Sequence, residues 1–246
     1  KNSKEIDMQK IELNELIIKD IAKGIAKKCR AEGVNSIAVA RDGRLSGESL
    51  LSSFCEAIAS YGLDVNCIGL ATSPMLYFAA KKEKSKSGIM ITGSHNPKDY
   101  NGIKMVINNS SVSGNEILAL IKDSEELNTS SHGQITYSNI KNLYIEEVIN
   151  NVEGDLSNLK VVLDSGNGVA GHVAPDLFKQ LGCEVIELYS DVDGNFPNHH
   201  PDPGKLENLE DIISEVKKHN ADIGFAFDGD GDRVGLITNK GEMIFP

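Results

Sequence analysis

Short apolar segments alternate with helical segments along this chain, and the alternation runs through once and then starts again. Three apolar segments of the first half have the length and composition of strands: SIAVA (36–40), DVNCIGL (64–70) and SGIMIT (87–92). Three more follow in the second half: LKVVLD (159–164), CEVIELYS (183–190) and ADIGFAF (221–227). Short strands that alternate with helices indicate parallel βαβ units. The sequence therefore predicts the α/β fold class, with two tandem repeated α/β domains whose mixed, largely parallel sheets are sandwiched by helices.

The segments between these strands carry helical periodicity. A first helix is expected over 13–31, with one apolar stripe formed by Leu13, Ile17, Ile21 and Ile25. A further helix follows the loop RDGRLSG (41–47) and runs to about Tyr61, and others are expected over 73–84, 174–182 and 206–220. The last of these has an apolar side formed by Leu206, Leu209, Ile213 and Val216.

The domain boundary is expected near residue 138. The pattern weakens after Lys104, and the Ser/Asn-rich tract NTSSHGQITYS (128–138) has the composition of a connecting segment. We therefore predict one domain over 1–138 and a second over 139–246.

Composition argues against several classes of partner. The chain has 246 residues, of which 40% are hydrophobic and 25% charged, as in soluble globular proteins. The net charge of −11 argues against a nucleic-acid partner, because phosphate backbones are bound by clustered Lys and Arg. No apolar run approaches 18 residues, so no membrane span is expected. Nothing in the composition indicates an oligomeric state.

The four cysteines are scattered, without the spacing of a metal finger, and lie mostly in apolar surroundings: Cys29, Cys55, Cys67 and Cys183. Buried free thiols in a reducing compartment are the expected state. No signal peptide is recognisable in the given sequence. We therefore expect a cytoplasmic protein.

Three aspartates, Asp228, Asp230 and Asp232, follow the last predicted strand with single glycines between them. Carboxylates this close repel one another unless a cation lies among them, and hard oxygen ligands select Mg²⁺ or Ca²⁺. Glycine permits tight turns with positive φ, which can direct all three side chains inward. The spacing favours a metal site over an acidic turn that simply faces water.

Two known loops resemble this spacing. A calcium EF-hand requires Gly at its sixth position and Glu at its twelfth, where this chain has Arg233 and Asn239, so that loop is excluded. A haloacid-dehalogenase-like, Mg²⁺-dependent phosphatase would use Asp228 as nucleophile and Asp230 as acid. Asp232 stands where that family has Thr or Ser, and the phosphatase is kept as an alternative.

A second conspicuous loop, TGSHNP (92–97), places Ser94 beside His95 directly after a strand. The G-x-S-x-G elbow of serine hydrolases is absent, and adjacent side chains point apart, so this is a poor Ser–His pair. The repeat makes ITGSHNP the counterpart of AFDGDGD in the second half. Ligands bind at the carboxyl ends of parallel strands, so both loops fall where chemistry is expected. A serine opposite a cation could carry phosphate and supply a further metal ligand.

The stretch GNGVAG (166–171) matches the dinucleotide-binding pattern G-x-G-x-x-G between a strand and a helix. Asp164 and Ser165 stand between the strand and the first glycine, where a carboxylate would repel pyrophosphate. The match also opens the second half rather than a complete dinucleotide domain. A dehydrogenase is therefore a minor alternative.

Five motifs together resemble the α-D-phosphohexomutase family, specifically its phosphomannomutase/phosphoglucomutase branch. They occur here in family order: TGSHNP, DYNGIK, DSGNGVAG, VDGNFPNHHPDPGK and FDGDGDRVG. The likeness runs from RDGRLSG at 41–47 to the end of the chain. It implies a four-domain enzyme whose first three domains share a repeated α/β unit. This chain would hold domain I with the phosphoserine loop and domain II with the metal-binding loop, while domains III and IV would be absent from it.

The resemblance also implies roles for individual residues. Ser94 would be the phosphoserine, and Asp228, Asp230 and Asp232 would hold Mg²⁺ together with a phosphoserine oxygen. Lys104, in YNGIK, matches the candidate general acid/base, and His95 and Arg233 would support the same pocket. The implied reaction interconverts hexose 1-phosphate and hexose 6-phosphate, of mannose or glucose, through a hexose 1,6-bisphosphate.

Three departures from the family pattern limit what this chain should do alone. The Y-D-I-R-G segment before the first helix is replaced by KNSKEIDMQK. The sugar-recognising G-E-x-S/T loop is missing, since GEM (241–243) is followed by Ile244 and comes too early. The phosphate-binding R-x-S-G-T loop is also missing. We therefore expect little or no mutase activity from this chain by itself, and a non-catalytic Mg²⁺-binding fragment stays a further alternative.

Overall fold

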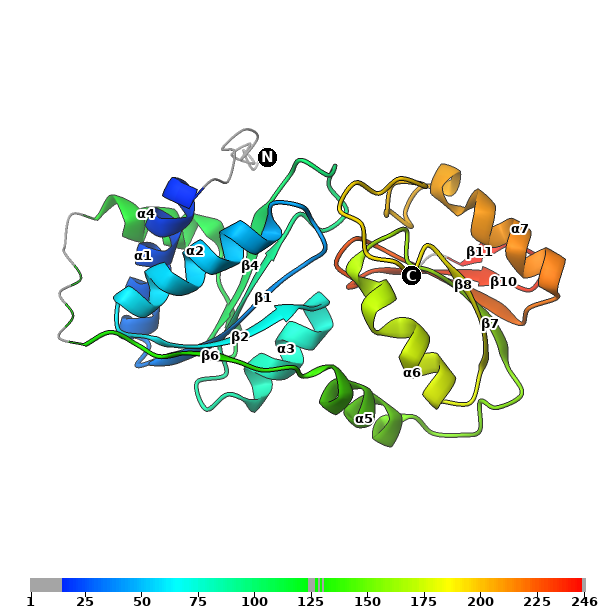
Figure 1. Cartoon of the computed structure of the whole chain (residues 1–246), viewed down its shortest axis with the longest axis horizontal. Helices are drawn as coiled ribbons and strands as arrows, with labels where there is room; N and C mark the ends of the chain where they lie inside the picture. Colours follow the sequence, from blue (N-terminus) through cyan, green and yellow to red (C-terminus); the bar gives the residue numbers. More distant parts are fainter. Residues whose placement is uncertain (1–14, 124–126, 128, 130, 245–246) are drawn as a thin grey trace, which may run out of the picture.

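The computed structural model describes residues 15–123, 127, 129 and 131–244 as two α/β halves that lie side by side (Figure 1). The first sheet has the order β5-β4-β3-β1-β2-β6. Its strands are β1 (Ser36–Arg41), β2 (Asp64–Leu70), β3 (Gly88–Thr92), β4 (Gly102–Ile107), β5 (Ser110–Ser111) and β6 (Ile135–Tyr137). The strands β3, β1, β2 and β6 are parallel, and at one edge β4 pairs antiparallel with β3 and β5 pairs antiparallel with β4.

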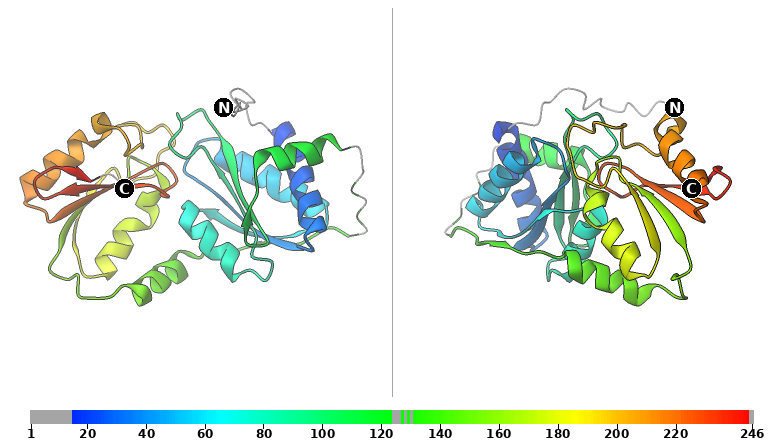
Figure 2. Two further views of the ribbon diagram at one scale, coloured as in Figure 1. Left: turned by 180° about the vertical axis from the view of Figure 1, so that it is seen from behind. Right: turned by 45° about the vertical axis from the view of Figure 1, so that its right-hand side comes forward.

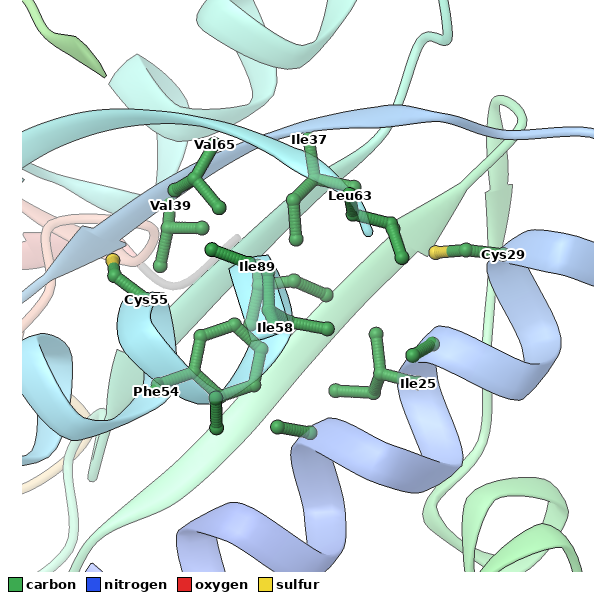
Figure 3. Packing of buried hydrophobic residues seen from close by; sticks show 14 of the residues in the cluster. Ile25, Cys29, Ile37, Val39, Phe54, Cys55, Ile58, Leu63, Val65 and Ile89 are labelled. Carbon is green, nitrogen blue, oxygen red and sulfur yellow. The ribbon is translucent and has the colours of Figure 1, made fainter. Parts of the chain in front are cut away.

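Helices cover both faces of this sheet. They are α1 (Glu15–Ala31), α2 (Gly47–Ser60), α3 (Ser73–Lys82) and α4 (Gly114–Lys122). On one face α1 packs against α2 and α4. Figure 3 shows Ile25 of α1 and Phe54 and Ile58 of α2 meeting side chains of the sheet such as Val39 and Ile89. The opposite face is covered by α3.

The second half repeats this plan. Its sheet has the order β11-β10-β9-β7-β8, so β7, β8, β9, β10 and β11 correspond to β1 through β5. The strands are β7 (Lys160–Asp164), β8 (Glu184–Leu188), β9 (Ile223–Phe227), β10 (Val234–Thr238) and β11 (Met243–Ile244). Helix α6 (Ala174–Gln180) packs on one face and α7 (Glu210–His219) on the other. The predicted fold class, two tandem α/β units with largely parallel sheets, is confirmed.

Several local expectations change in the structure. The first two residues of the helix expected over 13–31 lie outside the described part of the chain. The stripe expected over 206–220 is wrong at Leu206, which is 63% exposed. Leu209 and Val216 are buried, and Ile213 is partly buried against the same core, while Ile212, which the stripe did not include, is fully buried. Residues Leu206–Leu209 form a 3₁₀ turn and α7 starts only at Glu210, so the change in residues per turn shifts which side chains face the sheet.

Helix α5 (Lys141–Asn151) connects the cores of the two halves. It contacts α3 of the first half and α6 of the second, and lies below both sheets in Figure 2. Ile145, 1% exposed, belongs to one cluster with Met75 and Leu76 of α3 and Val173 before α6. The two halves therefore share apolar contacts.

Replacing Ile145 with alanine should destabilise both halves together. Removal of a buried isoleucine side chain leaves a cavity and costs about 2–4 kcal/mol of unfolding free energy. Urea denaturation, followed by far-UV circular dichroism, measures it. Leu143 on the same helix is 59% exposed, and Leu143→Ala should cost under ~1 kcal/mol. A loss for Ile145→Ala no larger than that of the control would contradict the shared core.

The four cysteines are free and buried, as predicted. Within the described residues, the structure contains no helix of sufficient length and apolarity to span a membrane.

Candidate functional site

The serine loop (92–97) and the acid loop (228–233) meet between the two sheets. Ser94 follows β3 and Asp228 follows β9, the corresponding strand of the other sheet. The Ser94 hydroxyl donates a hydrogen bond of 3.0 Å to Asp228 Oδ2. Two residues that are 134 positions apart in the sequence are thus brought into direct contact.

Asp228 is fully buried and has both of its oxygens occupied. Oδ1 accepts the amides of Asp232 and Arg233 at 3.0 and 3.1 Å, while Oδ2 accepts the Ser94 hydroxyl. Burial and the neighbouring charge of Asp230 raise the pKa of Asp228 to about 7. The carboxylate fixes the turn of its own loop and at the same time faces the serine.

Asp230 is also fully buried, but its two oxygens differ. Oδ2 accepts hydrogen bonds from the Lys104 ammonium at 2.6 Å and from the Ser73 hydroxyl. Oδ1 is buried and has no hydrogen-bond partner within the described structure. A buried carboxylate oxygen without a partner is costly, and a bound cation would satisfy it.

The three aspartates can act as one ligand set. One oxygen from each of Asp228, Asp230 and Asp232 lies within 4.8 Å of the others. Asp232 is the outermost, and its Oδ2 is 2.6 Å from Lys104 Nζ. Carboxylate oxygens in this arrangement suit a hard divalent cation such as Mg²⁺.

Glycine is required at each of the two positions between the acids, for a different structural reason at each. Gly231 adopts φ +70°, a left-handed conformation that other residues rarely take. Gly229 lies against the serine loop, where an added Cβ would come within 2.5 Å of the Ser94 carbonyl oxygen. Only glycine lets the acid loop approach Ser94 this closely.

Replacing Gly229 with alanine should push the two loops apart. The new methyl group meets backbone, which cannot rotate away, so the expected loss is about 1–3 kcal/mol of unfolding free energy. Thermal unfolding measures it. Gly204→Ala is the control, because its Cβ would meet only the carboxylate end of Asp202 at 3.1 Å. Equal stability of the two variants would show that close approach is not required.

Ser94 itself lies in a sparsely populated conformation, with φ +50°. Its amide donates to Thr92 Oγ1 at 2.8 Å, and Thr92 in turn donates to Asp42 Oδ2 at 2.7 Å. The Gly93 amide also donates to Asp42. A buried carboxylate from the end of β1 thus orders the start of the turn.

Arg44 holds the rest of the turn and was not predicted from the sequence. Its side chain is fully buried, and Nε donates to Asp42 Oδ2 at 3.1 Å. Its terminal nitrogens donate to three carbonyl groups of the serine loop, those of Ser94 at 2.9 Å, Asn96 at 2.7 Å and Pro97. The guanidinium carbon lies 5.6 Å from the centre of the Phe196 ring, which belongs to the second half.

The remaining predicted residues, Lys104, His95 and Arg233, differ in how closely their side chains approach the acid loop. Lys104, on β4, reaches the acid loop, and its pKa is raised: burial opposes the charge, but hydrogen bonds to Asp230 and Asp232 outweigh it. Burial, together with nearby Arg233, lowers the pKa of His95, whose Nδ1 is buried without a hydrogen-bond partner within the described structure. Arg233 is exposed, and it is its backbone amide that contacts Asp228.

The glycine-rich stretch at 166–171 packs beneath the acid loop. The Val169 amide donates to the Gly229 carbonyl at 3.2 Å. A Cβ added at Gly168 would lie 3.1 Å from Gly229 Cα, so the glycine permits this backbone contact. The carboxylate of Asp164 is buried just before the stretch.

Family models match both halves of the chain. The model described as phosphoglucomutase/phosphomannomutase, alpha/beta/alpha domain I, matches residues 4–131. The model for alpha/beta/alpha domain II of the same family matches residues 142–241. Together these two models match well over half of the chain.

Curated relatives and a solved structure agree with these matches. A phosphomannomutase/phosphoglucomutase of Pseudomonas syringae pv. tomato is 48% identical over 227 residues, which are 92% of this chain and 49% of the relative. A phosphoglucomutase of Neisseria gonorrhoeae is 44% identical over 229 residues, 92% of this chain and 50% of the relative. The crystal structure of a phosphoglucomutase/phosphomannomutase family protein from Burkholderia thailandensis superposes with a TM-score of 0.89 at 42% identity. That match covers 95% of this chain and 53% of the other, so the chain spans about half the length of these relatives.

Proposed function

This chain belongs to the phosphoglucomutase/phosphomannomutase family, and on that premise we propose that it is the phosphoserine- and metal-carrying half of a phosphohexomutase. The reaction interconverts hexose 1-phosphate and hexose 6-phosphate, of mannose or glucose, through a hexose 1,6-bisphosphate. The observation that carries the proposal is the 3.0 Å hydrogen bond from the Ser94 hydroxyl to Asp228, within the three-carboxylate cluster.

Ser94 is the proposed carrier of the phosphoryl group. In the first transfer, the P–O bond to Ser94 breaks and a P–O bond to a free hexose hydroxyl forms. The hydroxyl loses its proton, and the serine oxygen regains one. The bisphosphate then reorients, and its other phosphoryl group returns to Ser94. The hydrogen bonds from Arg44 and to Thr92 hold the turn and thus the serine oxygen in place, and such positioning supplies much of the rate in phosphoryl transfer.

Asp228, Asp230 and Asp232 are the proposed ligands of Mg²⁺, with an oxygen of phosphorylated Ser94 as a further ligand. The unpartnered Oδ1 of Asp230 and the closeness of the three carboxylates support this assignment. When bound, Mg²⁺ would neutralise negative charge that develops on the transferred phosphoryl group. Because Asp228 also accepts two backbone amides, its ligand oxygen is held by its own loop.

Lys104 is the proposed general acid/base. Its ammonium lies 2.6 Å from Asp230 and Asp232 oxygens, and the resulting raised pKa favours the proton-donating form. His95 and Arg233 are proposed supporting residues: His95 adjoins Ser94 in the serine loop, and Arg233 lies exposed at the end of the acid loop.

We propose that domain I spans residues 1–138 and domain II residues 139–246. The curated relatives are about twice as long as the matched region, and we propose that sugar recognition resides in the part of these relatives that this chain does not cover. This chain alone is then expected to accept a phosphoryl group without turning over hexose 1-phosphate at an appreciable rate. Free, buried thiols suit the reducing cytoplasm, where we place the protein.

The proposed function is tested by incubating the chain with glucose 1,6-bisphosphate and Mg²⁺ and measuring intact mass and phosphopeptides. Acid-stable phosphate on Ser94 is the expected result. A hydroxylamine-labile acyl phosphate on Asp228 would instead indicate the phosphatase alternative. Mg²⁺ binding without any label would indicate a non-catalytic fragment. Robust turnover of a hexose 1-phosphate would contradict the expected dependence on further domains.

A further inference from the structure

We infer that His199, a residue outside the proposed catalytic set, is an imidazolium that positions the serine loop over the acid loop. His199 is the first residue of a segment, 199–201, that we call the bridge segment. This segment belongs to the second half and contacts the serine loop of the first half, and His199 anchors it. The inference rests on the proposed function of Ser94, and it assigns His199 a positioning role without contact to the reacting atoms.

Both ring nitrogens of His199 face hydrogen-bond acceptors. Nε2 lies 3.0 Å from each carboxylate oxygen of Asp164, and Nδ1 lies 3.1 Å from the carbonyl oxygen of His200. A neutral imidazole has only one N–H, so it can satisfy only one of these acceptors, and the other contact would set two lone pairs against each other. The imidazolium donates both hydrogen bonds.

The surroundings of His199 favour its positive charge. Asp164, at the end of β7, is fully buried, so its carboxylate needs a compensating cation. The Tyr189 ring packs edge-to-face on the imidazole, with centroids 5.4 Å apart, and the Tyr189 hydroxyl donates to Asp211 of α7. Burial lowers the pKa of His199, but the hydrogen bonds and charge of Asp164 outweigh it, and the pKa is raised.

The bridge segment continues directly into the proposed active site. His200 Nε2 donates to the carbonyl oxygen of His95, the residue after Ser94, at 2.6 Å. Pro201 lies against both the glycine-rich stretch and the acid loop, since a Cβ added at Gly166 or Gly229 would come within 3.1 or 3.6 Å of it. The segment thus touches both loops that must face each other.

His199 therefore provides the charged anchor of a contact between halves. Its Nδ1 fixes the peptide of His200, whose ring then reaches the serine loop. Without the proton on Nδ1 of His199, the carbonyl of His200 would lose this donor, and His200 would no longer be held in this orientation. Because transfer depends on the position of Ser94 relative to the acid loop, a shift of about 1 Å would slow it by about 100-fold.

The first test is nuclear magnetic resonance of the ¹⁵N,¹³C-labelled chain, which needs no phosphoryl transfer. We expect both His199 nitrogens to be protonated at pH 7, and the His95 carbonyl shift to move in His199→Gln. Glutamine can donate to Asp164 from the position of Nε2, but it cannot also donate to His200. His219→Gln is the control, because His219 pairs with Glu215 on α7, away from the bridge segment.

The second test is the rate of Ser94 labelling by glucose 1,6-bisphosphate with Mg²⁺. We expect His199→Gln to slow labelling by about 100-fold, with Mg²⁺ affinity within about threefold of wild type, and His219→Gln to label normally. In His199→Asn the side-chain amide can take the place of Nδ1 and donate to the His200 carbonyl, but it no longer donates to Asp164. Labelling of this variant should also be slower than that of wild type. Asp164→Asn removes the charge partner, and the pKa of His199 should then fall.

The pH dependence of folding stability follows from the direction in which the pKa of His199 is shifted. The folded pKa of His199 lies above the ordinary value of about 6.5, so its pairing with Asp164 stabilises the fold fully below that value. This contribution is lost as pH rises through the folded pKa. Asp164, Tyr189, Asp211 and His200 are the titratable or hydrogen-bonding groups that face or flank the ring. His199→Gln should lack this alkaline loss of stability.

The outcomes separate this inference from the proposed function. A neutral His199 at pH 7 overturns the inference, and so does normal labelling of His199→Gln. If wild type is not labelled, the proposed function fails. In that case an unchanged His95 carbonyl shift in His199→Gln overturns the anchoring role, and a changed shift supports it.

Discussion

Replacing Ser94 with alanine should abolish phosphorylation of the chain by glucose 1,6-bisphosphate. Ser94 is the hydroxyl that lies 3.0 Å from Asp228, and no other group is proposed to carry the phosphoryl group. Intact-mass measurement after incubation with Mg²⁺ should show no added phosphate at times when wild type is fully labelled, a loss of at least about 1,000-fold in rate, as expected on removing a covalent nucleophile. Mg²⁺ affinity without phosphate should change little, since the three carboxylates remain.

Ser165→Ala is the matched control for this loss. Ser165 is fully buried directly before the glycine-rich stretch, and its hydroxyl has no hydrogen-bond partner in the described structure, so its removal should cost little. It should label as wild type does. Phosphate that persists elsewhere on Ser94→Ala would defeat the assignment, and phosphate on Asp228 would restore the phosphatase alternative.

The pairing of Ser94 with the acid loop follows from the repeat in the sequence. Each half places its conspicuous motif after the third strand, and corresponding strands of the two sheets end in loops that meet. Period and strand length are local properties, so the sequence alone predicted them well. The same local reading missed α4, although Ser113 and Glu116 form a capping box that marks its start.

The groups that support the site were not predictable in this way. Arg44 lies in a loop 50 residues before Ser94, and an arginine in a polar loop is ordinarily exposed. Its burial depends on contacts with the serine loop and with Phe196 of the other half. His199 likewise acquires its partner from β7, 35 residues earlier. Such contacts depend on how the halves pack, which periodicity does not report.

The antiparallel strands β4 and β10 are a second feature that the sequence pattern did not predict. Each follows a functional loop and returns along the strand before it, pairing with β3 or β9. On β4 this return places Lys104 opposite Met90, within reach of the acid loop of the other half. Lys104 was predicted only through the family resemblance. In the structure every β4 residue before Ile107 is partly buried, so no alternation of buried and exposed side chains distinguishes Lys104.

Replacing Arg44 with methionine should have the second largest effect, on stability and transfer together. Methionine retains much of the length but none of the donors, so Asp42 stays buried without its cation and three carbonyl groups of the serine loop lose their donors. Breaking a buried ion pair by removing one partner costs about 3–5 kcal/mol. Urea denaturation should show a loss of this size.

Arg44→Lys separates charge from geometry, and keeps the test informative if the methionine variant does not fold. Lysine retains the positive charge beside Asp42, but its single ammonium cannot reach all three carbonyl groups that the planar fork of arginine serves. The strained turn of Ser94, at φ +50°, then loses its support, and a displacement near 1 Å should slow labelling by about 100-fold. Arg41→Lys is the control, since Arg41 contacts the Asp42 carbonyl and Glu48 but not the serine loop. Labelling of Arg44→Lys at the rate of Arg41→Lys would show that charge alone suffices, and that the fork does not position the serine.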